Sequence, residues 1–317
     1  MKIIQLNEIE AVLPSLNLVP AIEAGFVAYS QGHAVVPPIG ELLLDEGEVH
    51  IKYGYLRQDK FYVVKIASGF YDNPKIGLPS SNGLMLLFSQ KTGALVSVLL
   101  DEGHLTDVRT AVAGAIAAKY LAPANAERIG IVGTGTQARL QLLHLKHVTP
   151  CRHVLVWGRG EAQLQRYCDD IEPHGFAVET TQDRADILRT CNLVVTATPA
   201  TAPLLHLADL QTGTHITAVG SDTPDKQELD SAILARADVV VADSVSQCLE
   251  RGEIHKAIQS GYVTRDDVVE LGDVIAGRAP GRTAQDQITV ADLTGVAVQD
   301  IKIAAAVYEA LNQGQSE

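Results

Sequence analysis

The stretch Arg128-Ile-Gly-Ile-Val-Gly-Thr-Gly-Thr-Gln-Ala-Arg139 decides the fold of this 317-residue chain. Its first part, Ile129 to Val132, is rich in β-branched residues and uncharged, as in a buried central strand. A glycine loop follows, Gly133 to Ala138, which fits the pattern G-x-G-x-x-A. From Gln137 to His147 the sequence continues with the spacing of an amphipathic helix. Strand, glycine loop and helix in this order predict a dinucleotide-binding turn.

The small residues of the loop have expected roles in that turn. Gly133 permits a tight turn, and Gly135 lets the backbone approach a pyrophosphate. Ala138 lets helix and strand pack closely, while the helix N-terminus offers amide donors to the anion. A plain glycine turn is the alternative. The predicted cofactor contacts in this loop are Gly133, Thr134, Gly135, Thr136 and Gln137.

Composition limits the class of protein. A chain of 317 residues is long enough for one large or two ordinary domains. The formal net charge of −13 argues against nucleic acid or an anionic membrane as partner. Four cysteines without C-x-x-C spacing, and no signal peptide or bilayer-spanning apolar run, predict a cytoplasmic protein. No zinc, Ser-His-Asp or P-loop pattern occurs, so no metal is expected.

The pattern of the chain changes near residue 122. Before it, residues 1–32 are predicted to be helical, with Val19 to Gln31 carrying apolar positions at helical spacing. Short apolar segments then predict an antiparallel or mixed sheet, followed by an alanine-rich helix from His104 to Leu121. The predicted strands are Val35–Val36, Glu41–Leu44, Val49–Tyr55, Phe61–Ile66, Leu84–Phe88 and Ala94–Leu100.

After Ala122, strands alternate with helical segments, which predicts a doubly wound parallel α/β domain. The predicted strands are Arg128–Val132, His153–Trp157, Ala177–Glu179, Leu193–Ala197, His215–Val219 and Asp238–Val241. Two later helices, Asp266–Gly277 and Gly295–Asn312, are expected with a short strand, Gln287–Val290, between them. Gly314 to Glu317 form a polar tail that we expect to fray.

The residues after the second of these strands bear on the choice of cofactor. Classical NAD sites place an acidic residue there, which binds the ribose hydroxyls. Here Trp157 is followed by Gly158 and Arg159 instead. A guanidinium pairs with a 2′-phosphate that a carboxylate repels, so NADP(H) is favoured and NAD(H) stays possible. The alternative is that Arg159 is a solvated loop residue.

Loops at the carboxyl ends of the fourth and fifth strands are expected to complete the ligand crevice. Thr196 and Thr198 stand at the first, where a hydroxyl is predicted to bond a ribose or phosphate or only to cap a turn. Val219 begins the second, which leads to Asp222. A carboxyl group facing the nicotinamide there can exchange a proton with an amine while hydride moves. An N-cap or Asx-turn role for Asp222 is the alternative.

Two cations before residue 122 are candidate substrate contacts. Lys65 lies inside the apolar run Phe61 to Ala67, so it either faces solvent or points into a site. Arg109 stands at the start of an alanine-rich helix, where the helix dipole disfavours a cation unless an anion is present. Arg109 is therefore a candidate clamp for a substrate carboxylate. His50, Lys52 and His104 are weaker candidates.

Together these stretches resemble the ornithine cyclodeaminase/mu-crystallin family over nearly the whole chain. The glycine loop is one of the matching segments. The others are Val64–Ile66, Gly77–Pro79, Leu105–Thr110 around Arg109, Ala117–Pro123, Val219–Asp222 with Lys226–Asp230, and Asp292–Gly295.

The resemblance implies an α/β enzyme and a homodimer. It implies a substrate-binding and dimerisation α+β domain from residues 1–121 with 292–317, and a Rossmann NAD(P)-binding domain from 122–291. Members act on small α-amino or α-imino acids with a nicotinamide cofactor. By position, Lys65 and Arg109 match residues that bind the substrate carboxylate, and Asp222 matches the acid/base carboxylate. Ser80 falls where the family often has a substrate-contacting threonine.

Departures from the family pattern help to choose the activity. Ornithine cyclodeaminases have an acidic residue at the Gly158 position, whereas Trp157-Gly-Arg159 looks like the Trp-Asn-Arg of mu-crystallin and related ketimine reductases, which favour NADPH. Ile39 stands where the archaeal alanine dehydrogenase of the family has a lysine. Ser81 to Gly83 differ from the apolar residues expected there, which suggests a specialised substrate pocket.

The expected function is therefore an NAD(P)H-dependent reductase of cyclic imino acids in proline metabolism. It would convert Δ1-pyrroline-2-carboxylate to L-proline or Δ1-piperideine-2-carboxylate to L-pipecolate. Arg109 and Lys65 would hold the carboxylate, and Asp222 would handle the nitrogen's proton. The alternatives are an ornithine cyclodeaminase, an alanine- or arginine-type amino-acid dehydrogenase, and an NADP-dependent small-molecule binding protein.

Overall fold

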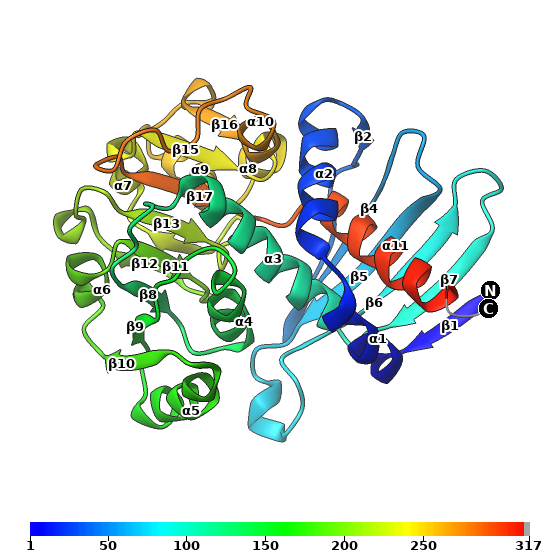
Figure 1. Ribbon diagram of the computed structural model, residues 1–317, viewed down its shortest axis with the longest axis horizontal. Helices are drawn as coiled ribbons and strands as arrows, with labels where there is room; N and C mark the ends of the chain where they lie inside the picture. Colours follow the sequence, from blue (N-terminus) through cyan, green and yellow to red (C-terminus); the bar gives the residue numbers. More distant parts are fainter. Residues whose placement is uncertain (314–317) are drawn as a thin grey trace. The chain divides into compact units, whose positions relative to one another are not determined.

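The computed structural model describes residues 1–313, and the chain in it divides into two compact units (Figure 1). Unit 1 runs from Met1 to Arg109 and resumes at Val296, and unit 2 is Thr110–Gly295. The division passes between Arg109 and Thr110, inside the helix α3 (His104–Leu121). The polar tail expected to fray lies outside the described residues.

A seven-stranded mixed sheet forms the body of unit 1. Its order is β1-β7-β6-β5-β4-β2, with β3 beside β4. Neighbouring strands are antiparallel except β1 and β7, which are parallel, so the predicted antiparallel or mixed sheet is confirmed. The strands are β1 (Lys2–Gln5), β2 (Ala34–Val35), β3 (Gly40–Leu44), β4 (Gly47–Leu56), β5 (Phe61–Gly69), β6 (Ser81–Ser89) and β7 (Leu95–Leu100).

Helices cover one face of this sheet. They are α1 (Leu6–Val12), α2 (Leu18–Ser30) and α11 (Ala297–Gln313), and α11 packs on β4, β5 and α2 (Figure 1). Because side chains alternate between the two faces of a strand, every second residue points toward these helices. The buried side chains on that face of β4, β5 and β6 are His50, Lys52, Leu56, Val63, Lys65, Met85 and Leu87. Most are apolar, but three are cationic or titratable, which marks the place of a site.

The prediction of helix throughout residues 1–32 is wrong at its beginning. Lys2–Gln5 form the strand β1, which pairs with β7 from Lys2 opposite Ser97 to Gln5 opposite Leu100. A segment this short has no periodicity of its own, and only its pairing partner fixes it as a strand. The remaining part of the prediction is confirmed by α1 and α2.

Unit 2 contains an eight-stranded sheet in which all neighbouring strands are parallel. Its order is β10-β9-β8-β11-β13-β17-β15-β16, so the predicted doubly wound parallel sheet is confirmed. The strands are β8 (Ile129–Val132), β9 (His153–Trp157), β10 (Ala177–Thr181), β11 (Leu193–Thr196), β13 (His215–Ala218), β15 (Val239–Ala242), β16 (Val268–Glu270) and β17 (Thr289–Asp292).

Two apolar clusters fill the two faces of this sheet. Ile129 and Ile131 pack on one side with helices α3, α4 and α5. Val132 packs on the other with helices α6, α7 and α9. A Cβ at Gly130, on that second side, would meet Ile187 Cγ2 at 2.9 Å, so glycine lets α6 approach β8. The helices are α4 (Thr136–Leu145), α5 (Glu161–Ile171), α6 (Ala185–Thr190), α7 (Ser231–Arg236), α8 (Val245–Cys248), α9 (Gly252–Gln259) and α10 (Leu271–Ile275).

The predicted helix Asp266–Gly277 is wrong over its first part. There the chain forms a 3₁₀ turn and the edge strand β16, and α10 begins only at Leu271. The apolar residues Val268 and Val269 pair with β15, which overrides the helical pattern. A small parallel sheet of β12 (Thr201–Leu205) and β14 (Gln227–Leu229) is not predicted. The 3₁₀ turns are η1 (Leu13–Ser15), η2 (Asn73–Ile76), η3 (Glu172–His174), η4 (Leu207–Asp209) and η5 (Arg265–Asp267).

Among residues 1–313, no single helix is long and apolar enough to cross a membrane. The pair Leu6–Ser15 and Leu18–Ser30 has the necessary length and composition only when taken together, across a bend of 93°.

Candidate active site

The predicted glycine loop lies at the topological switch point of the parallel sheet. Strand β8 has β9 on one side and β11 on the other, and the chain leaves it through Gly133. Gly133 has a φ of 117°, and a Cβ there would meet the Ala197 carbonyl oxygen at 2.8 Å. Both the backbone angle and the close approach require glycine. Ligands of doubly wound sheets bind at this point.

The next residues present backbone amides to solvent. Gly135 is the N-cap of α4, and both it and Thr136 are exposed. A Cβ at Gly135 would meet no protein atom within 4 Å. Arg139 fixes the loop, because its Nη1 donates to the carbonyls of Thr134 and Gly135. Its Nε donates to Asp170 at 2.8 Å. An open backbone at a helix N-terminus fits the pyrophosphate of a dinucleotide.

The end of β9 presents Gly158 and Arg159. A Cβ at Gly158 would meet Thr134 Cγ2 at 2.8 Å, so any side chain there would press on the glycine loop. Arg159 is exposed. A hollow of about 590 Å³ lies between the start of α5 and the end of β10, lined by Glu161, Leu164, Gln165, Thr180, Thr181 and Gln182.

The two threonines predicted as cofactor contacts are both engaged by a buried acid. Thr196 is fully buried, and its Oγ1 donates to Glu228 at 2.7 Å. Thr198 donates to Glu228 twice, from its Oγ1 and from its backbone nitrogen, each at 2.7 Å. Val219 lies just beyond β13, and its nitrogen donates to the Thr196 carbonyl at 3.0 Å. A direct cofactor contact by these residues stays a prediction.

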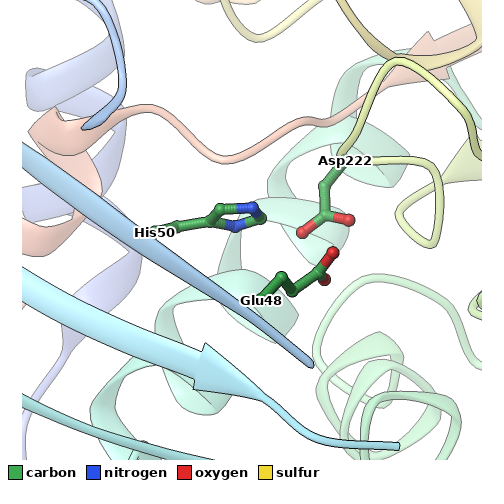
Figure 2. Close-up of side chains that lie close together, drawn as sticks. All are labelled: Glu48, His50 and Asp222. Atoms are coloured by element: carbon green, nitrogen blue, oxygen red, sulfur yellow. The ribbon is translucent and has the colours of Figure 1, made fainter. Parts of the chain in front are cut away.

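Asp222 lies on the loop after β13, and its side chain is 33% exposed (Figure 2). Lys226 is buried and its Nζ donates to Asp222 Oδ1 at 2.7 Å. The nearest following helix, α7, is capped by Asp230, so Asp222 is not its N-cap. An accessible carboxylate held by a lysine fits a group that exchanges protons with a bound substrate.

In unit 1, three buried cations gather around the helix-covered face of the sheet. Lys52 on β4 and Lys65 on β5 stand directly opposite each other, and their side chains share that face. Like charges at such positions destabilise a sheet unless anions accompany them. Arg109, from the first turns of α3, joins them, and the three residues are 5%, 2% and 4% exposed respectively. Lys65 and Arg109 are the predicted carboxylate-binding pair.

An aspartate from α11 lies among these cations. Asp300 is fully buried; its Oδ1 is 2.9 Å from Arg109 Nε and its Oδ2 is 3.4 Å from Lys65 Nζ. Gln299 accepts a hydrogen bond from Arg109 Nη1 at 3.0 Å. We call Lys52, Lys65, Arg109 and Asp300 the cation cluster.

The electrostatics of the cation cluster favour an additional anion. Burial, the neighbouring Arg109 and Lys52 together lower the pKa of Lys65 to about 7, although Asp300 opposes the shift. Burial raises the pKa of nearby Asp101, whose carboxylate accepts the Leu105 amide at 2.9 Å. Lys65 and Arg109 are buried donors that share one aspartate, and a ligand carboxylate beside them would accept charge-assisted hydrogen bonds from both.

Two other residues named in the sequence analysis, His50 and Ser80, lie elsewhere in unit 1. Glu48 and His50 precede Lys52 on the same face of β4 (Figure 2). His50 Nε2 is 3.0 Å from Glu41 Oε1, and Tyr71 donates to Glu48 Oε1 at 2.7 Å. Ser80 lies in the loop before β6, five residues from Met85, which pairs with Lys65. That is about 17 Å along the strand, so the sheet itself does not bring Ser80 beside Lys65.

Three side chains at these sites are absent from the sequence-based predictions or underrated in them. Lys52 ranked as weak because one lysine in a strand has no distinctive pattern. Its signal is the pairing of β4 with β5, which places it opposite Lys65. Asp300 is an ordinary acidic residue within a helical pattern, and Glu228 lies in the family-matching segment Lys226–Asp230 but was given no role. Only the fold reveals that both are buried.

Comparison with known proteins places these features in a family. The sequence pattern of the ornithine cyclodeaminase/mu-crystallin family matches residues 1–315. The chain belongs to this family. The predicted resemblance is thereby confirmed.

Individual relatives align with this chain over almost its full length. An uncharacterized cyclodeaminase of Sinorhizobium fredii is 44% identical over 315 residues, covering 98% of this chain and 95% of the relative. An archaeal alanine dehydrogenase dimer with bound NAD has a TM-score of 0.91 at 34% identity, covering 99% and 96%. The Δ1-pyrroline-2-carboxylate reductase of Thermococcus litoralis, in complex with NADH and L-proline, has a TM-score of 0.93 at 27% identity, covering 99% and 98%.

These relatives confirm the Rossmann-type fold and the class of protein. The chain is an enzyme, an oxidoreductase of carbon–nitrogen bonds that uses a nicotinamide cofactor. Its relatives act on small amino or imino acids, and the two solved structures contain NAD or NADH. The fit of the glycine loop to a pyrophosphate agrees with this assignment.

Proposed function

We propose that this enzyme reduces cyclic imino acids, Δ1-pyrroline-2-carboxylate to L-proline and Δ1-piperideine-2-carboxylate to L-pipecolate. The observation that carries the proposal is the cation cluster, in which the buried Lys65 and Arg109 share the fully buried Asp300. A substrate carboxylate beside them would favour the charged form of Lys65 and accept charge-assisted hydrogen bonds from both cations. Lys65 and Arg109 bind that carboxylate in this proposal, with Lys52 beside them.

Asp222 is the proposed acid. Reduction of an imine adds a proton to nitrogen and a hydride to carbon, and protonation makes the carbon more electrophilic. The bound nicotinamide supplies the hydride. Asp222 delivers the proton to the ring nitrogen, and Lys226 at 2.7 Å orients its carboxyl group. Residues 133–137 hold the pyrophosphate through backbone amides.

We further propose that NADPH is the preferred cofactor, with Arg159 at its 2′-phosphate. The support is an exposed guanidinium after β9, where an acidic residue would instead favour NAD. Gly158 contributes by its small size, which keeps the glycine loop in place. Thr196, Thr198 and Val219 would lie along the cofactor at the ends of β11 and β13.

Arg159→Ala is expected to raise the dissociation constant of NADPH by about 10- to 100-fold. A hydrogen bond between charged groups contributes about 1.5–3 kcal/mol. The dissociation constant of NADH should change by less than about threefold, since NADH lacks the 2′-phosphate. Arg166→Ala, on the exposed side of α5, is the matched control because it removes the same charge. Equal losses for both cofactors would remove Arg159 from the 2′-phosphate site.

A homodimer is also proposed, formed through unit 1. The sheet face opposite the helices is apolar on three neighbouring strands, and Tyr62 and Phe88 stack on it with ring centroids 4.8 Å apart. Its side chains are half-buried or exposed: Ile51, Tyr53, Tyr55, Tyr62, Val64, Ile66, Leu84, Leu86 and Phe88. A second copy of this chain would cover them, as in the alanine dehydrogenase described as a dimer.

Residues 1–121 with 292–317 then form the substrate and dimerisation domain, and 122–291 form the cofactor domain. We place the enzyme in the cytoplasm, since its four cysteines are all free thiols.

A turnover screen tests the proposed function. Each ketimine, L-ornithine and L-alanine are incubated with the purified enzyme and NADPH, NADH, NADP⁺ or NAD⁺, and nicotinamide absorbance and L-proline are measured. We expect ketimine-dependent oxidation of NADPH. Conversion of L-ornithine to proline and ammonia without ketimine reduction would favour a cyclodeaminase, which the 44% identical relative supports by its name. NAD⁺ reduction with L-alanine alone would favour an amino-acid dehydrogenase.

A further inference from the structure

Glu228 is a buried acid whose hydrogen-bond partners are not among the residues predicted to bind substrate. It lies on β14, is fully buried, and each of its oxygens accepts two hydrogen bonds. Thr198 donates to Oε1 from its nitrogen and its hydroxyl, both at 2.7 Å. The Thr196 hydroxyl at 2.7 Å and the Gly220 nitrogen at 3.0 Å donate to Oε2. A carboxylate has about four acceptor sites, so its capacity is filled.

The donors to Glu228 come from two loops of the cofactor domain. Thr198 follows β11, and Gly220 follows β13, the strand that pairs with β11. A Cβ at Gly220 would collide with the Thr198 carbonyl and with Glu228, so the two loops touch at that point. The loop after β11 also contacts the glycine loop, because a Cβ at Gly133 would meet the Ala197 carbonyl oxygen. Glu228 therefore joins the surroundings of the pyrophosphate to the loop that carries Asp222.

A second buried acid fixes Glu228 in turn. Glu253 on α9 accepts the Glu228 amide at 2.7 Å and the Leu229 amide at 3.1 Å. Burial raises the pKa of Glu228 to about 7 and the pKa of Glu253 to about 8, while the donors around Glu228 oppose its shift. An acid of this kind is costly as a core residue, because burying its charge is unfavourable. If Glu228 positions the surrounding loops, that role explains why a costly buried acid stands here.

We propose that Glu228 is a positioning residue that fixes the loops after β11 and β13 at the nicotinamide end of the cofactor site. This inference rests on the proposed function. The adenine half is assigned to the ends of β8 and β9, near Arg159. The nicotinamide half therefore extends across the switch point toward β11 and β13. Through Gly220, the same contact sets the direction of the chain that leads to Asp222.

The test compares whole and half cofactors in Glu228→Gln and Thr198→Val. In Glu228→Gln an amide group replaces one acceptor and meets N–H donors, so at least one loop must shift. Dissociation constants for NADPH and for 2′,5′-ADP, which lacks the nicotinamide half, are measured by quenching of Trp157, the chain's single tryptophan. We expect about a tenfold or larger loss of NADPH affinity and less than about a twofold change for 2′,5′-ADP.

Two further variants make the result specific. Thr198→Ser keeps the hydroxyl and is expected to bind NADPH more tightly than Thr198→Val. Thr190→Val makes the same change on α6, where the hydroxyl donates to the Asp186 carbonyl at 2.8 Å, and serves as the control. Wild-type NADPH affinity in Glu228→Gln would overturn the proposal. Parallel losses for NADPH and 2′,5′-ADP would also overturn it, because they indicate general damage. Wild-type enzyme that binds NADPH but reduces no ketimine refutes only the substrate assignment.

Discussion

Asp222→Asn is expected to slow ketimine reduction by about 10²- to 10⁴-fold, the usual contribution of a positioned acid or base. Asparagine keeps the size of the side chain and an Oδ1 that accepts from Lys226, so the loop should keep its shape. What is lost is the ability to give a proton to the ring nitrogen. Binding of NADPH should change little, since the variant alters none of the groups assigned to the phosphates.

Steady-state kinetics measure the effect of Asp222→Asn on turnover, and a separate cofactor titration measures its effect on NADPH binding. Asp225→Asn is the matched control, because Asp225 is an exposed acid on the same loop and the change in charge is the same. That control should retain wild-type turnover. A normal rate in Asp222→Asn would show that another group protonates the substrate. A large loss of NADPH affinity would show that Asp222 supports the cofactor.

Asp300→Asn is expected to destabilise the fold by about 3–5 kcal/mol near pH 6, as removing one partner of a buried ion pair usually does. Asparagine preserves the volume but leaves Lys65 and Arg109 without the anion at 3.4 and 2.9 Å. The pKa of Lys65, already lowered to about 7 by burial and by Arg109, should fall further. Urea unfolding at several pH values measures both effects.

The loss of stability in Asp300→Asn should change with pH in a definite direction. In the wild type, the folded state releases the Lys65 proton near pH 7, and the unfolded chain keeps it up to its ordinary pKa of 10.5. Between those values the unfolded state binds more protons, so this group makes stability rise with pH. Below pH 7 Lys65 is charged in both states and depends on Asp300. The destabilisation by Asp300→Asn should therefore be larger at pH 6 than at pH 9, where only Arg109 still requires the anion.

A surface acid on the same helix provides the control. Glu309 pairs with Lys60 at 2.8 Å, and both side chains are well exposed. Glu309→Gln removes the same charge from α11 and should leave the unfolding midpoint nearly unchanged. A pH-independent loss in Asp300→Asn would contradict the assigned coupling to Lys65.

Local sequence patterns predicted most of the fold. Ile129 to Val132 and the following glycine loop are sufficient to place the central strand and its turn, because burial and backbone angle act on these residues directly. The strands β1 and β16 were missed because pairing with β7 and β15, and not their own periodicity, determines them. In both places a partner distant in sequence outweighs the local preference.

The site was predictable only where chemistry conflicts with the local pattern. Lys65 in an apolar strand and Arg109 at a helix start are such conflicts, and both fall in the cation cluster. Asp300 conflicts with nothing around it in the sequence, because an aspartate in a helix is ordinary. Its burial follows from packing of α11 on β4 and β5, which the sequence does not state. Glu228 escaped prediction for the same reason.

The placement of α11 also has a consequence for biosynthesis. The strands that carry Lys52 and Lys65 are made early, while the helix that brings Asp300 to them leaves the ribosome only after the whole of unit 2. A nascent chain therefore holds two facing lysines on a sheet that still lacks α11 until translation is nearly complete. Unit 2 is continuous in sequence and has its own core, so it is able to fold first. Its folding would bring the last helix back to a sheet synthesised long before it.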